Sequence, residues 1–193
     1  EKGNFLPPDN YQEDRKPKVV MRTSSTNIGL ALLAVMASYD LKFENLEDTL
    51  NLLYKMLETI SGLTKWNGHL YNWYNIETLE PLIPKYVSSV DSGNFVGYLY
   101  VLKQFLIEKR ENKNDEIYQN LSSEEKEQNV QIMPDVLNKI DFMINVTDSL
   151  INNTDFSKLY DSENRLFSIG FNVEENKLTD SYYDLLASEA RQT

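Results

Sequence analysis

The eight residues from Gly68 to Asn75 hold four rings: one imidazole, two phenols and one indole. The rings belong to His69, Tyr71, Trp73 and Tyr74, with Asn72 among them. Flat apolar rings can lie beneath the C–H faces of a sugar, and amides bind its hydroxyl groups. Aromatic runs are more often core packing. This run lies on a connection rich in Pro and Gly, however, and binding residues are frequent on such loops. Both interpretations, a sugar-binding loop and a packed one, follow from these residues.

Four acidic residues are candidates for glycosidic-bond chemistry: Asp91, Asp161, Asp184 and Glu189. That chemistry uses two carboxyl groups, about 5–5.5 Å apart for retention of configuration and about 6.5–9.5 Å apart for inversion. Asp91 precedes an apolar helical pattern and is equally well explained as a helix N-cap. Glu189 stands in an apolar helical segment, where it is either ion-paired or a site residue with a raised pKa. Asp184 is also explained as plain surface charge.

Composition excludes several other kinds of chemistry. The chain has 193 residues and a net charge of −11, and phosphate binding needs clustered Lys and Arg, so no nucleic-acid partner is expected. The absence of cysteine excludes disulfides and thiolate metal sites, and the single histidine has no G-x-S-x-G elbow with which to form a triad. No apolar run approaches the ~18 residues of a membrane helix. The sequence begins at Glu1 rather than Met, so we expect it to be part of a longer polypeptide.

Helical periodicity dominates the chain. Capping side chains and apolar spacing predict five helices, at about 26–39, 46–62, 91–110, 134–151 and from 180 onward. Two segments between them, 66–89 and 156–173, predict short strands or extended loops, with a hairpin turn at 161–164. Residues 1–21 contain three prolines and predict an extended entry segment. The sequence is therefore mainly α with short β-hairpin or extended insertions, in one domain.

Six phrases of the sequence resemble, in the same order, motifs of the cyclic β-1,2-glucan synthases. They are Arg22–Leu30, Gly68–Tyr74, Tyr86–Asn94, Leu159–Asp161, Leu166–Asn172 and Tyr183–Arg191. The first resembles R-T-S-P-T-N-I-G-L, with Ser25 in place of the proline, and the second resembles G-H-F-Y-N-W-Y. The third matches Y-V-S-S-V-D-S-G-N throughout. Six ordered motifs make this a specific resemblance.

The resemblance implies a fold and an activity. In that family the segment lies between a glycosyltransferase and a phosphorylase-like module, in a glucoamylase-like (α/α)₆ barrel similar to bacterial endo-β-1,2-glucanases. Residues 1–193 would form the N-terminal portion of that domain, about half of the barrel, with the rest of the parent polypeptide as its partner. The implied ligand is a β-1,2-glucan oligosaccharide or polysaccharide, and the implied reaction is ring-closing transglycosylation or hydrolysis. Neither a metal nor a cofactor is implied. The implied location is the cytoplasmic side of a bacterial cell, with the parent protein associated with the membrane.

The resemblance also implies roles for individual residues. Glu189 falls at or near the acid position of the glucanases, and Asp91 falls at an aspartate that grips the substrate. The predicted substrate-binding set is completed by His69, Tyr71, Asn72, Trp73, Tyr74 and Asp184. Since part of the catalytic apparatus is expected beyond Thr193, the chain alone is predicted to be inactive.

Two other functions stay open. One is non-catalytic glucan binding through Tyr71, Trp73 and Asp91, and the other is a helical protein-interaction module, consistent with amphipathic helices and an acidic surface. Half a barrel would leave apolar helix faces such as Ile28–Ala37 uncovered. Self-association of the isolated chain is therefore expected.

Overall fold

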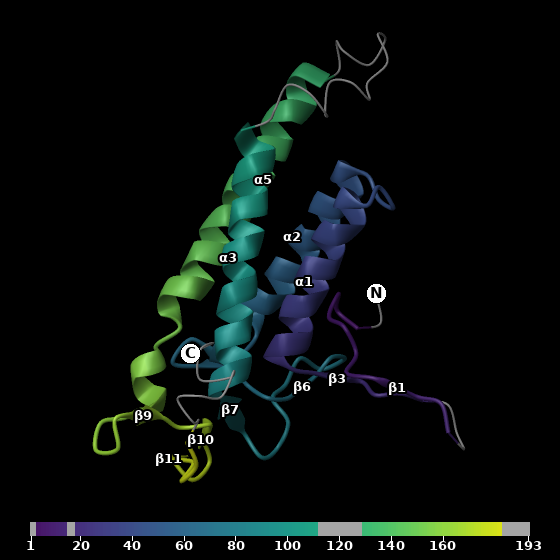
Figure 1. Cartoon of the computed structure of the whole chain (residues 1–193). Coiled ribbons are helices and arrows are strands. Elements are labelled where there is room, and N and C mark those ends of the chain that lie inside the picture. Colours follow the sequence, from purple (N-terminus) through teal and green to yellow (C-terminus); the bar gives the residue numbers. More distant parts are fainter. Residues whose placement is uncertain (1–2, 15–17, 112–128, 183–193) are drawn as a thin grey trace.

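The computed structural model describes residues 3–14, 18–111 and 129–182, with short strands gathered at one end of a group of helices (Figure 1). The described helices are α1 (Ser25–Asp40), α2 (Leu46–Gly62), α3 (Ser89–Glu111) and α5 (Asn129–Asn153). Helices α1 and α3 start beside the strands and run away from them, whereas α2 and α5 return toward them (Figure 1). The main packing contacts join α1 to α3 and α2, and α5 to α3 and α2. The predicted helical architecture with short β insertions is confirmed in the described residues.

The first two helices begin where capping side chains predict. Ser24 caps α1, because its Oγ accepts a hydrogen bond of 3.2 Å from the backbone N–H of Asn27. Asn45 caps α2 in the same way, accepting from the N–H of Asp48 at 2.9 Å. The predicted apolar stripe of α2 is buried, with Leu53 and Ile60 both 0% exposed. Both predicted helices are confirmed.

Two predicted helix starts are wrong. Helix α3 begins at Ser89, and Ser88 Oγ accepts from the backbone N–H of Asp91 at 3.2 Å, so Asp91 lies in the first turn and is not the cap. Helix α5 begins at Asn129, five residues before Pro134. Five residues after the helix start, Pro134 lies beyond the first turn, where N–H groups lack intrahelical partners, so it removes one i→i−4 hydrogen bond. Pro134 lies inside α5 and does not open it.

The strands are short and all described pairs are antiparallel. The two-stranded pairs are β1 (Tyr11–Gln12) with β2 (Lys18–Val19), β3 (Arg22–Thr23) with β6 (Tyr74–Asn75), β4 (Lys65–Trp66) with β5 (His69–Leu70), and β8 (Tyr160–Asp161) with β9 (Leu166–Phe167). The three-stranded sheet has the order β11 (Lys177–Leu178), β10 (Gly170–Asn172), β7 (Tyr86–Ser88). A 3₁₀ turn, Phe156–Leu159, connects α5 to β8. The predicted hairpin turn at 161–164 is confirmed, since Asp161 Oδ1 accepts from the N–H groups of Glu163 and Asn164.

The core lies between the four helices and continues beneath the strands. Leu32 of α1, Leu57 of α2, Leu102 of α3 and Ile140 of α5 are all 0% exposed and belong to one apolar cluster. Gly29 allows α1 and α3 to approach closely, because a Cβ at this position would overlap the ring of Tyr98. No helix in the described ranges is both long enough and apolar enough to cross a membrane. The packing of α1 against α3 thus fixes the relative positions of the first turns of these two helices.

Candidate functional site

Asp91 lies where the first turns of α1 and α3 meet. Its Oδ1 accepts a hydrogen bond of 2.6 Å from Thr26 Oγ1, and its Oδ2 lies 3.4 Å from the donor Nδ2 of Asn72. Asn94 Nδ2 in turn donates to Thr26 Oγ1 at 3.4 Å. Three parts of the chain therefore meet at one carboxylate: α1, α3 and the aromatic loop, Gly68–Asn75. The structure brings together two predicted site residues, Asn72 and Asp91.

Sequence reasoning missed Thr26 as part of this cluster. Thr26 belongs to the run Thr23–Asn27, whose side chains are all of the kinds that cap helices. Ser24 performs the capping, and the hydroxyl of Thr26 points to Asp91 instead. The available signal was the surplus of hydroxyl groups, since one N-cap needs one side chain.

Backbone pairing holds the aromatic loop beside this cluster. The N–H of Asn72 donates to the carbonyl of Tyr86 at 2.8 Å, and the N–H of Leu82 donates to the carbonyl of Trp73 at 2.8 Å. Strand β6, which follows Trp73, pairs with β3 just before α1. The loop is thus attached on one side to the entry of α1 and on the other to the entry of α3.

Trp73 is partly exposed and one of its faces is occupied. The guanidinium carbon of Arg22 lies 4.3 Å from the centre of the Trp73 ring, a cation–π contact. Arg22 also forms an ion pair of 3.1 Å with Asp9, which accepts a further bond from Asn27 Nδ2. Trp73 can therefore offer a sugar only the face that Arg22 leaves open.

Tyr74 and Tyr71 are packing residues in this structure. Tyr74 is 0% exposed, its hydroxyl donates to the carbonyl of Thr64 at 2.6 Å, and it accepts from the N–H of Tyr71 at 2.9 Å. Burial raises the pKa of Tyr74 well above its ordinary value. Tyr71 is also buried, its ring lies edge-on to that of Tyr74, and burial raises its pKa. In this structure both tyrosines support the loop. Their direct contact with a ligand stays a prediction.

His69 is buried between the β4–β5 hairpin and the end of α5. Its Nε2 lies 3.1 Å from the carbonyl oxygen of Asp155, so Nε2 carries the proton, and Nδ1 is buried with no partner among the described residues. The ring meets Phe156 edge-on, and Trp66, beside His69, stacks on Phe171 at 4.3 Å. These contacts give His69 and Trp66 places in the core of the hairpin.

Acidification is expected to destabilise the fold through His69. Burial lowers its pKa below the ordinary 6.5, against an opposing contribution from the carbonyl and charge of Asp155. The unfolded chain therefore binds a proton at a pH where the folded chain does not, so stability is complete above 6.5 and falls as the pH drops below it. Urea unfolding between pH 7 and about pH 5, above the carboxylate range, measures this loss.

The matched variant is His69→Phe, which removes the chain's only imidazole. It should unfold with little pH dependence over the same interval. Parallel stability–pH curves for the two proteins would rule out His69 as the titrating group.

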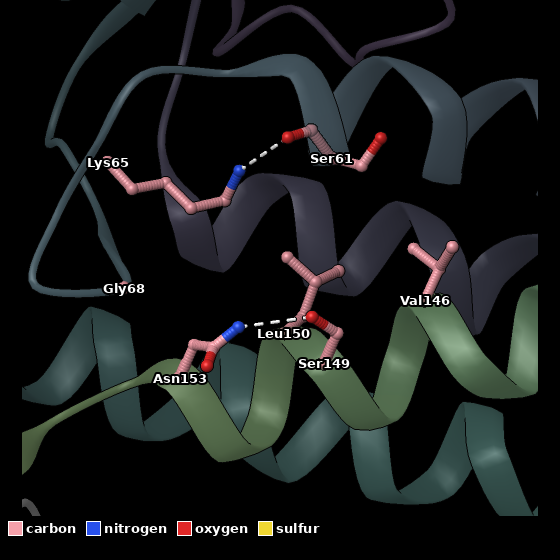
Figure 2. A pocket seen from close by; sticks show the side chains of 7 residues that line it. All are labelled: Ser61, Lys65, Gly68, Val146, Ser149, Leu150 and Asn153. Atoms are coloured by element: carbon pink, nitrogen blue, oxygen red, sulfur yellow. Dashed lines mark hydrogen bonds between the residues drawn. The ribbon is translucent and has the colours of Figure 1, made fainter.

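A separate hollow of 260 Å³ lies between the end of α2, the β4–β5 hairpin and α5. Figure 2 shows its lining: Ser61, Lys65, Gly68, Val146, Ser149, Leu150 and Asn153. Lys65 Nζ donates to the carbonyls of Ile60, Ser61 and Leu63 at the end of α2, and burial lowers its pKa to about 8. None of the lining residues belongs to the Asp91 cluster. The ammonium acts as a cap for the last carbonyls of α2.

Of the other predicted carboxylates the structure describes only Asp161, and it does not join the Asp91 cluster. Asp161 is part of its hairpin turn, where the Tyr182 hydroxyl at 2.6 Å and the Asn164 amide hold its pKa well below the usual range. Asp184 and Glu189, and the predicted last helix, lie outside the described residues, so their roles stay predictions. Among the described residues, no group of three or more His, Asp or Glu side chains is placed to hold a metal ion.

Comparison with known proteins gives one sequence relative of interest. No family model matches the chain. Cyclic β-(1,2)-glucan synthase NdvB of Rhizobium meliloti (strain 1021) is 44% identical over 118 residues. The chain is similar to a segment of a cyclic β-1,2-glucan synthase. The resemblance predicted from the six motifs is therefore confirmed. The aligned segment covers 61% of this chain but only 4% of the length of the synthase.

Solved structures with this fold include two kinds of protein. A candidate glucoamylase from Bacteroides fragilis NCTC 9343 matches with a TM-score of 0.64 at 13% identity, over 90% of this chain and 36% of its own. The endo-β-1,2-glucanase of Chitinophaga pinensis, solved with sophorotriose and glucose, matches with a TM-score of 0.58 at 13% identity, over 87% of this chain and 34% of its own. At such identities the likeness shows the fold alone. The cyclic-glucan-synthase-like chain thus has a glucoamylase-like arrangement and spans about a third of these solved chains.

Proposed function

We propose that this chain is the N-terminal part of a glucoamylase-like domain that acts on β-1,2-glucan, by ring-closing transglycosylation or by hydrolysis. The observation that carries the proposal is the 44% identity to a segment of a cyclic β-1,2-glucan synthase. The Asp91 cluster supports it, because a carboxylate, an amide and a partly exposed indole lie at the strand end of the helices. Such groups bind sugar hydroxyls and C–H faces. The cytoplasmic side of a bacterial cell is the proposed location.

The proposal assigns different tasks to the predicted residues. Asp91, Asn72 and the open face of Trp73 contact the glucan, while Tyr71, Tyr74 and His69 hold the loop in place. Glu189 supplies the acid. Asp9 is ion-paired with Arg22, the residue that covers one face of Trp73. Since glycosidic-bond chemistry uses two carboxyl groups across a cleft, the chain by itself is proposed to bind glucan without turning it over.

The proposal includes an incomplete barrel. On α1 the exposed positions Leu30, Ala34 and Ala37 repeat at helical spacing, and on α3 Gly97 and Val101 do the same. Leu30 and Val101 are 49% and 52% exposed, although both are apolar. The solved glucoamylase-like chain is nearly three times as long as the part matched here, which supports coverage of these faces by the remainder of the domain. A second copy of the chain could cover the same faces, as expected from their apolar character.

Loss of the Trp73 ring is expected to abolish glucan binding. The proposal places one face of this indole under a sugar ring, and loss of such an aromatic contact removes most of the affinity of a shallow site. Calorimetry with linear β-1,2-gluco-oligosaccharides on the wild type and on Trp73→Ala measures this. Phe43→Ala is the matched control, because Phe43 is 77% exposed in the α1–α2 connection, at the far end of the helices. No binding by a well-folded wild-type protein would count against the proposed function.

A further inference from the structure

The hydroxyl of Thr26 is committed to Asp91. Thr26 Oγ1 lies 2.6 Å from Asp91 Oδ1, a short distance typical of a hydroxyl that donates to a charged carboxylate. Asn94 Nδ2, at 3.4 Å, donates to the same hydroxyl and so leaves its proton directed at Asp91. The hydroxyl has no part in capping α1, which Ser24 does. The hydrogen bond from Thr26 of α1 therefore holds the Asp91 side chain in one rotamer.

Asn72 faces the other oxygen of Asp91 with its donor end. Its Nδ2 lies 3.4 Å from Asp91 Oδ2, and the opposite orientation would place two acceptors against each other. Its Oδ1 is then turned away from Asp91, and it is buried with no partner among the described residues. An unpaired buried acceptor costs about 1–3 kcal/mol, and Asn72 nevertheless keeps its donor end on Asp91.

Resting on the proposed function, we propose that Thr26 is a positioning residue that, together with Asn72, holds Asp91 as a fixed acceptor, and that this carboxylate selects ligands by the hydroxyl groups they donate. Both oxygens of Asp91 already accept one bond each from the protein, and a carboxylate oxygen has room for another. A site built in this way rejects an analogue that lacks the hydroxyl, because the acceptor is then left unpaired.

Arg22 adds a restriction to the same site. Its guanidinium covers one face of Trp73 at 4.3 Å and is itself held by Asp9. A ligand that stacks on the indole therefore has a single face to use, since Arg22 occupies the other. Stacking alone does not distinguish a sugar from its deoxy analogue, so selection falls to Asp91.

The test compares two ligands on two Thr26 variants of the full-length protein. The ligands are a linear β-1,2-gluco-oligosaccharide and the same molecule with single hydroxyls replaced by hydrogen, titrated by calorimetry. Thr26→Val keeps the side-chain shape but loses the donor, and we expect it to weaken binding of the hydroxylated ligand about 10-fold or more and to reduce the discrimination between the two ligands. Thr26→Ser restores the donor and should restore both. Asn72→Ala should weaken binding of the hydroxylated ligand much more than that of the best deoxy analogue.

The controls distinguish a positioning role of Thr26 from an effect on stability and from a failure of the proposed function. Thr59→Val also removes a hydrogen-bonded hydroxyl, one that donates to the carbonyl of Asn4 at 2.9 Å, and should leave discrimination unchanged. Thermal unfolding of each variant identifies a merely structural effect, which would lower both affinities equally. Wild-type protein that binds and discriminates, with Thr26→Val discriminating as well as wild type, overturns the inference alone. Failure of the wild type to bind either ligand overturns the proposed function.

Discussion

Replacing Glu189 by Gln is expected to lower turnover of linear β-1,2-glucan by several orders of magnitude in the whole parent polypeptide to which this chain is proposed to belong. The resemblance to the glucan synthases and glucanases places Glu189 at or near the acid position. Glutamine keeps the shape and the hydrogen bonds of the side chain but has no proton to give to a leaving oxygen, and general acid catalysis contributes about 10²–10⁴-fold. Product formation over time, with wild-type and variant at equal concentration, measures the loss. Binding of the oligosaccharide should persist, because the change touches chemistry and not affinity.

Glu175→Gln is the control for this prediction. Glu175 is an exposed glutamate of the β10–β11 connection, and its loss of charge should leave turnover unchanged. Near-normal turnover by the Glu189→Gln protein would remove this residue from the acid role. It would then favour a glucan-binding module whose chemistry takes place elsewhere in the polypeptide.

Local patterns predict the helices of this chain because capping and apolar periodicity act within a few residues. Asn45 and the stripe Leu53–Ile60 locate α2 without any knowledge of its neighbours. The start of α3 was predicted two residues late because Ser88 and Asp91 are both good caps. Their competition is decided by β7, which ends at Ser88 through its pairing with Gly170, far away in the sequence.

The types of residue at the site were predictable from the sequence, but the contacts between these residues were not. Asp91 and Asn72 stand out in the sequence, yet the hydroxyl that orients Asp91 comes from a residue 65 positions away. The sequence also does not show which aromatic side chains of the loop are buried and which are exposed. The structure buries Tyr74 of β6 completely and leaves Trp73, just before this strand, partly exposed under Arg22. Contacts of this kind depend on how the helices pack, which no local pattern contains.

Replacing Gly68 by Ala is expected to destabilise the fold by roughly 3 kcal/mol or more. Gly68 has a φ of +83°, which costs a residue with a Cβ, and the added Cβ would overlap the carbonyl of Asn153 at the end of α5. The nearest atoms that this Cβ would meet belong to the backbone of Asn153 and Thr154, so no side-chain rotation can relieve the overlap. The hairpin would have to leave α5, breaking the bond from the Asp155 N–H to the Asn67 carbonyl at 3.1 Å and the contact of His69 with Asp155. Urea unfolding measures the loss.

Gly97→Ala is the matched control, because a Cβ at this helical position meets nothing within 4 Å. It should stabilise α3 by about 0.5–1 kcal/mol, since alanine loses less conformational freedom than glycine on entering a helix. Opposite shifts of the two unfolding midpoints would therefore locate the strain at the junction of the hairpin with α5. The same hairpin leads directly into the loop of Asn72 and Trp73, so Gly68→Ala should also weaken glucan binding, whereas Gly97→Ala should not. Equal midpoints for the two variants would mean that the hairpin is free to move away from α5, and the loop would then owe its position to β3 and β7 alone.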